Sequence, residues 1–245
     1  GLPLLAGQGM IDITGKPLAS MYFMQIVWGL RKEPFIGVRP LNHAKEAPTT
    51  GAWQFTNAID SWSWQGYEGE KAVVEVYANS ASVRLLLNGK EIANKPVKKY
   101  KTLFKLPYQP GTLTAEALDE RANVISSHSL TTAGEETVLR VTPDKMVLCA
   151  NNQALCYLPI EFTDKAGNLK PYMEQRVEVA VAGAATLAGF GSALCKTNEV
   201  FDKPYHQSYR GRCLAVLRAG STPGKAKVTV TSAGMEPVTI EVEVQ

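Results

Sequence analysis

The sequence has little of what marks membrane, nucleic-acid and metal-binding proteins. Its longest nearly uninterrupted apolar stretch, Leu18–Leu30, is broken by Ser20, Gln25 and Gly29 and is too short to span a bilayer. Lys and Arg form no block of five or more, and the net charge is only +3, so we expect no nucleic-acid partner. The three histidines lie far apart without a neighbouring ligand, which predicts no metal site.

Signatures of nucleophilic and cofactor-dependent catalysis are also missing. No G-x-S-x-G elbow occurs, and no cysteine has a credible histidine partner. Gly189-Phe190-Gly191 lacks the third glycine of a phosphate loop, because position 194 is Leu, and no helix pattern follows. We therefore predict no cofactor.

Paired carboxylates for hydrolysis have only weak candidates. Hydrolytic carboxylates need a rigid scaffold that fixes their separation. Asp119-Glu120 and Glu135-Glu136 fall in turns and read as solvated residues. Asn198-Glu199 lies in a polar connection rather than on a strand. The sequence predicts no catalytic residue in this chain.

Cysteine usage is low, with four residues that all fall in the second half. The six-residue gap between the first two fits neither a redox pair nor a zinc ribbon. Cys156 alternates in register with Leu158, Ile160 and Phe162, which predicts a core thiol. Free buried thiols are favoured over a disulfide framework, and the cysteines leave the compartment undecided.

What the sequence does have is enough apolar material for a sizeable core. The chain has 245 residues, of which 45% are hydrophobic and 20% charged, and this excludes disorder. One helix is expected over Leu18–Trp28, with Pro17 at its start and Gly29 at its end. Its apolar side chains surround the axis, so the helix is expected to be covered on all sides.

From about Lys71 the hydrophobic period changes from 3.6 to 2. Asn88-Gly89 predicts a hairpin over Val83–Ala93, because this dipeptide favours a two-residue turn. Further strands are expected over Thr102–Leu106, Thr112–Leu118 and Val124–Leu130. Together they predict a small antiparallel sandwich.

A second strand series follows the polar run Thr131–Glu136, where we place a domain boundary. The expected strands are Val138–Val141, Met146–Leu148, Leu155–Phe162, Val177–Val181, Thr186–Phe190, Arg212–Leu217, Lys225–Thr231 and Val238–Val244. Seven or eight short strands at this spacing are typical of an immunoglobulin-like sandwich. The prediction is an all-β protein: two immunoglobulin-like antiparallel sandwiches in tandem after one short helix, over residues 41–134 and 135–245, with residues 1–40 outside them.

The tryptophans give the one binding signal. All four lie in the first 64 residues, and Trp62 and Trp64 share one face of an extended segment. Exposed, these two indoles form a platform on which a sugar can stack; buried, they anchor an edge strand. Trp53, Trp62 and Trp64 are the candidate carbohydrate contacts.

Residues spread along the chain carry a family resemblance. Gly9–Pro17, followed by Ser20, Tyr22, Gln25 and Trp28, resembles the end of the catalytic barrel in glycoside hydrolase family 2, the β-galactosidase family. Two later groups resemble the sandwich domains that follow the barrel: first Trp62–Trp64, Val73–Tyr77, Leu85–Lys90 and Leu106–Leu113, then Tyr157–Asp164, Gly167, Gly189–Gly191 and Tyr209–Arg212.

This resemblance implies a non-catalytic piece of a larger enzyme. In that family both catalytic glutamates sit in the barrel, and neither maps onto this sequence. The expected role is to buttress a barrel, which is the expected partner, and to shape one rim of its cleft, in an enzyme expected in the periplasm or outside the cell. The start at Gly1 shows no leader pattern and is expected to be trimmed.

Two alternatives remain open at this point. The chain is then either a stand-alone carbohydrate-binding module built around Trp62 and Trp64, or an adhesive pair of immunoglobulin-like domains. Neither alternative explains the apolar helix at Leu18–Trp28. That helix is also expected to mediate self-association of the isolated chain, since exposed apolar patches mark missing partners.

Overall fold

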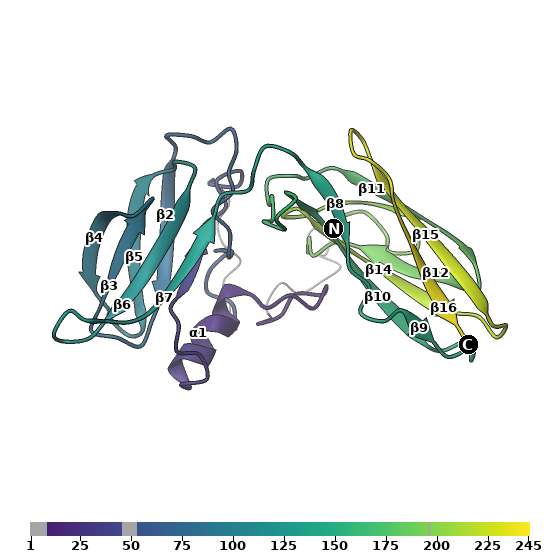
Figure 1. Ribbon diagram of the computed structural model, residues 1–245, viewed down its shortest axis with the longest axis horizontal. Helices are drawn as coiled ribbons and strands as arrows, with labels where there is room; N and C mark the ends of the chain where they lie inside the picture. The colour runs from purple at the N-terminus through teal and green to yellow at the C-terminus, as the bar shows by residue number, and fades with distance from the viewer. Residues whose placement is uncertain (1–8, 46–52, 196) are drawn as a thin grey trace. The chain divides into compact units, whose positions relative to one another are not determined.

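A computed structural model describes residues 9–45, 53–195 and 197–245. The described residues divide into two compact units, the N-terminal unit up to Ala133 and the C-terminal unit from Gly134 onward. Both are built almost wholly of strands, as predicted (Figure 1). No helix in the described part of the chain has the length and apolar character that crossing a membrane requires.

The N-terminal unit contains two antiparallel sheets. In the first, hydrogen-bonded neighbours follow the order β1 (Phe35–Val38), β2 (Lys71–Tyr77), β5 (Lys101–Pro107). In the second, the order is β4 (Lys90–Pro96), β3 (Ser82–Leu87), β6 (Thr112–Leu118), β7 (Val124–Thr131). Alternate residues of β3 are buried, namely Val83, Leu85 and Leu87, which is the period predicted from the sequence.

The predicted β3–β4 hairpin is confirmed. Asn88 and Gly89 both take left-handed backbone angles, with φ of 53° and 77°. This is the turn geometry whose twist matches that of the two strands it joins. The pairing of the two strands contains a bulge, where the register shifts between Leu85 and Leu86.

The predicted helix is also confirmed, as α1 (Ala19–Val27). Gly29 ends it with φ of 71°, and Leu30 N–H donates back to the carbonyl of Gln25 at 2.8 Å. That pattern closes a helix through a left-handed residue, where glycine pays no steric penalty.

The helix is covered on one side rather than on all sides. Ala19 and Ile26 are buried against Phe35 and Tyr77 of the β1–β2 sheet. Tyr22 stacks on Phe35 with ring centroids 4.5 Å apart. Beyond the helix end, Trp28 and Leu30 remain 58% and 73% exposed. The expectation of complete cover is therefore wrong within this unit.

Strand β1 was not expected and corrects the assignment of residues 1–40. Phe35–Val38 pairs with β2 over four residues, so this segment belongs to a sandwich sheet. All four residues are buried, since one face meets the sandwich core and the other meets α1. A strand covered on both faces shows no alternation, which is why its sequence gave no period-2 signal.

The C-terminal unit is a second sandwich. Its two sheets have the orders β12 (Ala185–Gly191), β14 (Arg212–Ala219), β10 (Leu155–Thr163), β8 (Val138–Val141), and β13 (Tyr205–Gln207), β11 (Arg176–Gly183), β15 (Gly224–Ser232), β16 (Val238–Val244), β9 (Val147–Leu148). All pairs are antiparallel except β16 with β9. Inward side chains of both sheets, among them Phe162 and Val228, share one core.

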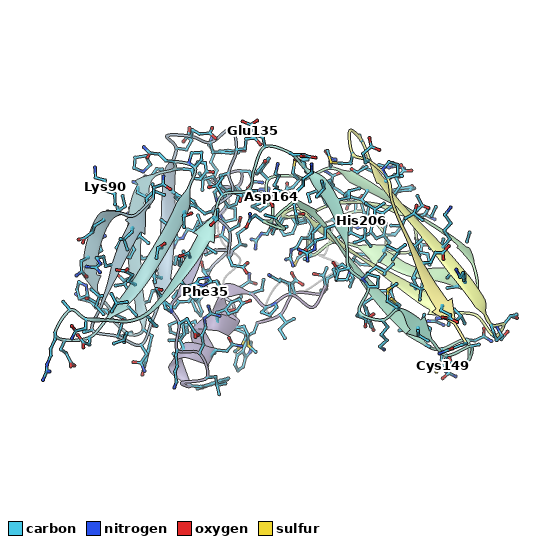
Figure 2. The ribbon with its side chains drawn as sticks, viewed as in Figure 1. Phe35, Lys90, Glu135, Cys149, Asp164 and His206 are labelled. Carbon is cyan, nitrogen blue, oxygen red and sulfur yellow. The ribbon has the colours of Figure 1, made fainter. Side chains whose placement is uncertain are left out.

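The polar run Thr131–Glu136 is hydrogen-bonded to the sandwich that follows it. Gly134 N–H donates to the Asp164 carboxylate at 2.9 Å, and the fully buried Lys170 donates from Nζ to the carbonyl of Glu135 at 2.8 Å. Figure 2 labels Asp164 and Glu135. Burial lowers the pKa of Lys170, while nearby carboxylates oppose that shift. The backbone of this run is therefore hydrogen-bonded at Gly134 and Glu135, although its composition is polar.

All four cysteines are free thiols in the described structure. Cys156 and Cys213 are buried in the core of the C-terminal unit, as predicted for Cys156, while Cys149 is exposed and Cys195 is half-buried. Burial raises the pKa of Cys156 to about 11 and also raises the pKa of Cys213. The expectation of buried free thiols holds for Cys156 and Cys213 but not for Cys149, which is exposed.

Thiol titration should therefore resolve different classes of cysteine. In native protein we expect one fast-reacting thiol at Cys149 and none from the two buried thiols, because they lack both access and thiolate character. Cys149→Ser should remove the fast phase alone. In denaturant, before any reductant is added, four thiols should react; a smaller total would reveal a disulfide and contradict this assignment.

Candidate functional site

The three candidate tryptophans lie in very different surroundings. Trp53 is 59% exposed, whereas Trp62 and Trp64 are each 0% exposed. A sugar stacks on an aromatic face that solvent can reach, so neither buried indole offers a platform. Of the two alternatives for Trp62 and Trp64, the structure therefore shows the buried anchor. Trp53 keeps an accessible face and remains a candidate contact.

Trp62 is held by contacts from distant parts of the N-terminal unit. Its indole Nε1 donates to the carbonyl of Gln109 at 3.0 Å, and its own carbonyl accepts from Thr132 Oγ1 at 2.7 Å. Its ring meets that of Tyr108 edge-on at 4.9 Å. The segment thus ties the β5–β6 connection to the end of β7.

The two residues after Trp62 repeat the same pattern. Trp64 N–H donates to the hydroxyl of Tyr108 at 3.0 Å, and Ala133 N–H donates to Ser63 Oγ at 2.9 Å. The Trp64 indole nitrogen is buried and has no hydrogen-bond partner among the described atoms, which is an unfavourable feature that dense packing has to offset. This stretch is an anchor of the fold.

A buried carboxylate forms the strongest electrostatic feature of the N-terminal unit. Glu75, on β2, is 0% exposed and accepts hydrogen bonds from Arg39 Nε at 2.9 Å, Thr56 Oγ1 at 2.9 Å and Tyr77 OH at 2.8 Å. Lys101 Nζ lies 2.6 Å from its second oxygen. The network joins β2, β5 and two parts of the segment between β1 and β2.

These neighbours stabilise the charged form of the Glu75 carboxylate. Burial acts to raise its pKa, but the hydrogen bond and charge of Lys101, together with bonds from Tyr77 and Arg39, hold the pKa below its ordinary value. The same carboxylate, after the effect of burial, helps to raise the pKa of Tyr77. The tyrosine therefore stays a neutral donor.

Sequence reasoning missed this network. Glu75 sits between Val74 and Val76, so alternation alone assigns it to an outer, solvated face. That face is covered by α1 and the segment that contains Thr56. The lysine opposite Tyr77 in the β2–β5 register, Lys101, is the one sequence signal that could have suggested a buried pair.

The acidic residues considered for hydrolysis have structural roles. Asp119 accepts from the backbone N–H groups of Arg121 and Asn123, each at 2.8 Å, and bonds from Asn123 lower its pKa. Glu199 accepts from Gln207 N–H at 3.0 Å and lies 3.3 Å from Nδ1 of the buried His206.

Metal-ligating side chains are not gathered anywhere in the described part of the chain. No group of three or more His, Cys, Asp or Glu residues there has a geometry that could hold an ion.

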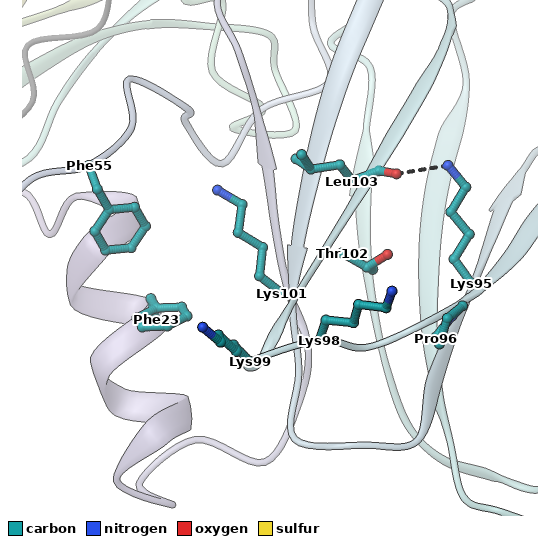
Figure 3. A pocket seen from close by; sticks show the side chains of 9 residues that line it. All are labelled: Phe23, Phe55, Lys95, Pro96, Lys98, Lys99, Lys101, Thr102 and Leu103. Carbon is teal, nitrogen blue, oxygen red and sulfur yellow. Dashed lines mark hydrogen bonds between the residues drawn. The ribbon is translucent and has the colours of Figure 1, made fainter.

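One groove is found beside the Glu75 network. It has a volume of about 620 Å³ and lies between α1 and the turn that joins β4 to β5 (Figure 3). Aromatic rings and lysine side chains line it: Phe23, Phe55, Lys95, Pro96, Lys98, Lys99, Lys101, Thr102 and Leu103. Neither aromatic ring of this groove was among the predicted candidates.

Both units match known families. A family model described as glycoside hydrolase family 2 C-terminal domain 5 matches residues 139–241, within the C-terminal unit. A second model, described as a domain of unknown function (DUF4982), matches residues 69–125, within the N-terminal unit.

Relatives match nearly the whole chain. The β-galactosidase BoGH2A of Bacteroides ovatus is 26% identical over 240 residues, which cover 97% of this chain and 25% of that protein. A crystal structure of a glycosyl hydrolase family 2 member from Bacteroides cellulosilyticus has a TM-score of 0.85 at 26% identity, covering 98% of this chain and 32% of the other.

A β-glycosidase from Bacteroides vulgatus shares the fold, with a TM-score of 0.74 at 22% identity over 96% of this chain and 28% of that one. The chain thus spans between a quarter and a third of the length of these relatives.

Replacing Glu75 by glutamine should destabilise the N-terminal unit. Loss of the buried charge leaves Lys101 and Arg39 without their counter-ion, but both cations partly reach solvent, so we expect a loss of about 2 kcal/mol in unfolding free energy. Urea unfolding followed by tryptophan fluorescence measures it, because all four tryptophans lie in this unit.

The pH dependence has a defined sign. The folded-state pKa of Glu75 lies below its unfolded value near 4.5, so its contribution is complete above that value and is lost as the pH falls through the folded-state pKa. Glu75→Gln should flatten this acid-side loss. Glu116→Gln, which removes the partly exposed ion pair with Arg84, is the matched control and should change stability by less than about 1 kcal/mol. Equal effects of both substitutions would contradict the special role of Glu75.

Proposed function

Because the chain is a C-terminal region of glycoside hydrolase family 2, we propose that it is the non-catalytic accessory part of a larger, β-galactosidase-like enzyme of carbohydrate degradation. The observation that carries this proposal is the match of 97% of the chain to 25% of a β-galactosidase. A piece of this proportion, made of two sandwiches, supports a role beside a separate catalytic domain.

The surroundings of the acidic side chains support a non-catalytic role. Two-carboxylate hydrolysis needs a pair of carboxyl groups that face a bound sugar across about 5 or 6.5–9.5 Å. Asp119 is engaged by its own turn and Glu199 by Gln207 and His206, while Glu135 and Glu136 are exposed in the connection between the units.

Exposed apolar residues near the start of the described chain support a buttressing role. Ile11 and Ile13 are 50% and 47% exposed, and Trp28 and Leu30 at the end of α1 are exposed by more than half. Large apolar side chains gathered in one short segment mark a surface that another part of a protein covers. The accessory role assigns that cover to the catalytic barrel.

A stand-alone carbohydrate-binding module is the second candidate, but its main sequence support is weakened. It was based on Trp62 and Trp64 as a sugar platform, and both indoles are fully buried. The accessory role needs no platform at this position and is favoured for that reason.

The isolated chain should not hydrolyse glycosides. Purified protein is assayed for release of chromophore from aryl β-galactoside, β-glucuronide and β-mannoside, with an active β-galactosidase as the positive control. We expect no turnover above the rate of the buffer. Activity that survives repurification and is abolished by Glu199→Gln would overturn the proposal.

The isolated chain should self-associate through its uncovered apolar residues. Light scattering over a range of concentrations should show a monomer–dimer equilibrium that Trp28→Glu together with Leu30→Glu shifts to monomer, because burying each large side chain contributes roughly 1.5–3 kcal/mol. Met146→Glu, at a residue 53% exposed in the C-terminal unit, is the control. A monodisperse monomer of the unsubstituted chain at every concentration would count against a missing partner at this surface.

A further inference from the structure

Positive charge is concentrated on one short stretch of the N-terminal unit. Residues 90–105 contain six lysines and a single glutamate, although the whole chain has a net charge of only +3. These residues form β4, the following turn and most of β5. Because other residues separate most of the lysines in sequence, no basic block is visible there, and folding brings four of them to one groove.

The groove between α1 and this turn combines that charge with aromatic side chains. The ring of Phe55 is 37% exposed and meets that of Phe23 edge-on at 5.1 Å. Leu103, on β5, adds a further exposed apolar side chain. The volume of about 620 Å³ lies within the range of about 300–1,000 Å³ that small-molecule sites occupy.

Two of the four lysines are engaged within the protein. Lys101 Nζ is bound to Glu75, and Lys95 Nζ donates to the carbonyl of Leu103 at 2.9 Å. Lys98 and Lys99 are exposed at the turn, and neither forms an ion pair within 4.0 Å with a carboxylate of the described residues. Figure 3 shows the Lys99 ammonium on the side of the aromatic rings and the Lys98 ammonium on the side of Lys95.

The turn that presents these lysines has an unusual backbone. Lys99 and Tyr100 both adopt left-handed angles, with φ of 49° and 63°. Lys98 and Lys101 close the turn by exchanging backbone hydrogen bonds of 3.0 and 3.1 Å. Asn and Gly suit such positions, and a bulky residue there is uncommon. Strained backbone of this kind is found preferentially where a side chain has to be presented for a function.

We propose that this groove binds an acidic oligosaccharide, one whose sugar rings carry carboxylate groups. The apolar face of a sugar ring packs on Phe55 and Phe23, and the carboxylates pair with the ammonium groups of Lys99 and Lys98. The separation of the two lysines on opposite sides of the groove favours a ligand with more than one charged ring. The choice of a saccharide rests on the proposed function, and the choice of an acidic one rests on the lysines.

Binding to oligogalacturonate of three sugar units tests the proposal directly. Calorimetric titration of the whole chain should give a dissociation constant of about 1 mM, typical of a small, open site, and binding should weaken as salt is added. Neutral maltotriose, of the same length, should bind at least tenfold more weakly. Equal binding of the two sugars, or binding of neither, would overturn the proposal.

Paired variants locate the site. Lys98→Gln with Lys99→Gln should weaken oligogalacturonate binding about tenfold, and Phe55→Leu should also weaken it while keeping an apolar side chain in place. Lys145→Gln with Lys227→Gln makes the same charge change at exposed residues of the C-terminal unit and should leave binding unchanged. Unchanged tryptophan fluorescence shows that the variants of the N-terminal unit are folded, and an unchanged far-UV circular dichroism spectrum shows the same for the control pair, whose unit contains no tryptophan. If both lysine pairs weakened binding equally, the loss would follow from net charge alone, and the proposed site would be refuted.

A third ligand distinguishes a sugar site from a general anion site. A tri-glutamate peptide carries comparable carboxylates without a ring to pack on the aromatic side chains, so it should bind at least fivefold more weakly than oligogalacturonate. Equal binding of the peptide would overturn the saccharide assignment. Failure of these titrations leaves the accessory role standing, because that role is decided by the hydrolysis and light-scattering measurements.

Discussion

Glu75 has no access to water. Arg39 and Lys101 balance its charge and Thr56 donates a further hydrogen bond, so three other segments of the N-terminal unit meet at this carboxylate. Arg39 follows β1, Thr56 precedes the tryptophan anchor, and Lys101 begins β5. A buried charge is costly unless it is paired and hydrogen-bonded, so each of these segments has to take its place for the network to close. The network thereby fixes how these segments lie on the face of the β1–β2–β5 sheet against which α1 packs.

This constraint also positions the groove. Lys101 spans the two features: its ammonium reaches Glu75, and its stem lines the groove next to Phe55. The ammonium lies 5.6 Å from the centre of the Phe55 ring and 5.5 Å from that of Tyr77. With Lys101 held inside the unit, Lys98 and Lys99 at the adjoining turn are the lysines of the groove whose charges are exposed and not engaged within the protein.

Most strands could be predicted because only one of their faces is buried. The β3–β4 hairpin shows alternation and an Asn-Gly turn, and both survive folding unchanged. The end of α1 was equally clear from Gly29. β1 was missed because both of its faces are covered. β13 was missed because it has only three residues and its one buried side chain is a histidine, His206, which gives no apolar signal. Local pattern fails where burial comes from segments far away in sequence.

The aromatic residues that reach solvent were harder to predict for the same reason. For Trp62 and Trp64 the sequence left a sugar platform and a buried anchor both open, and in the structure Tyr108 and the residues after β7 enclose them. Phe55 gave no signal, since its exposure depends on how α1 and β5 approach it. The sequence indicated only the tryptophans as candidates, and the packing decided which aromatic side chains reach solvent.

The lysines of β4 have a second consequence. β4 is the edge strand of its four-stranded sheet, and nearly all of its residues are exposed. An uncovered strand edge invites pairing with the same edge of another molecule, and charged side chains and proline are the usual protection against it. Lys90, Lys95 and Pro96 occupy that edge. We therefore expect the lysines of β4 to disfavour pairing of this edge with another molecule, so that a neutral version of the strand would be more prone to aggregate.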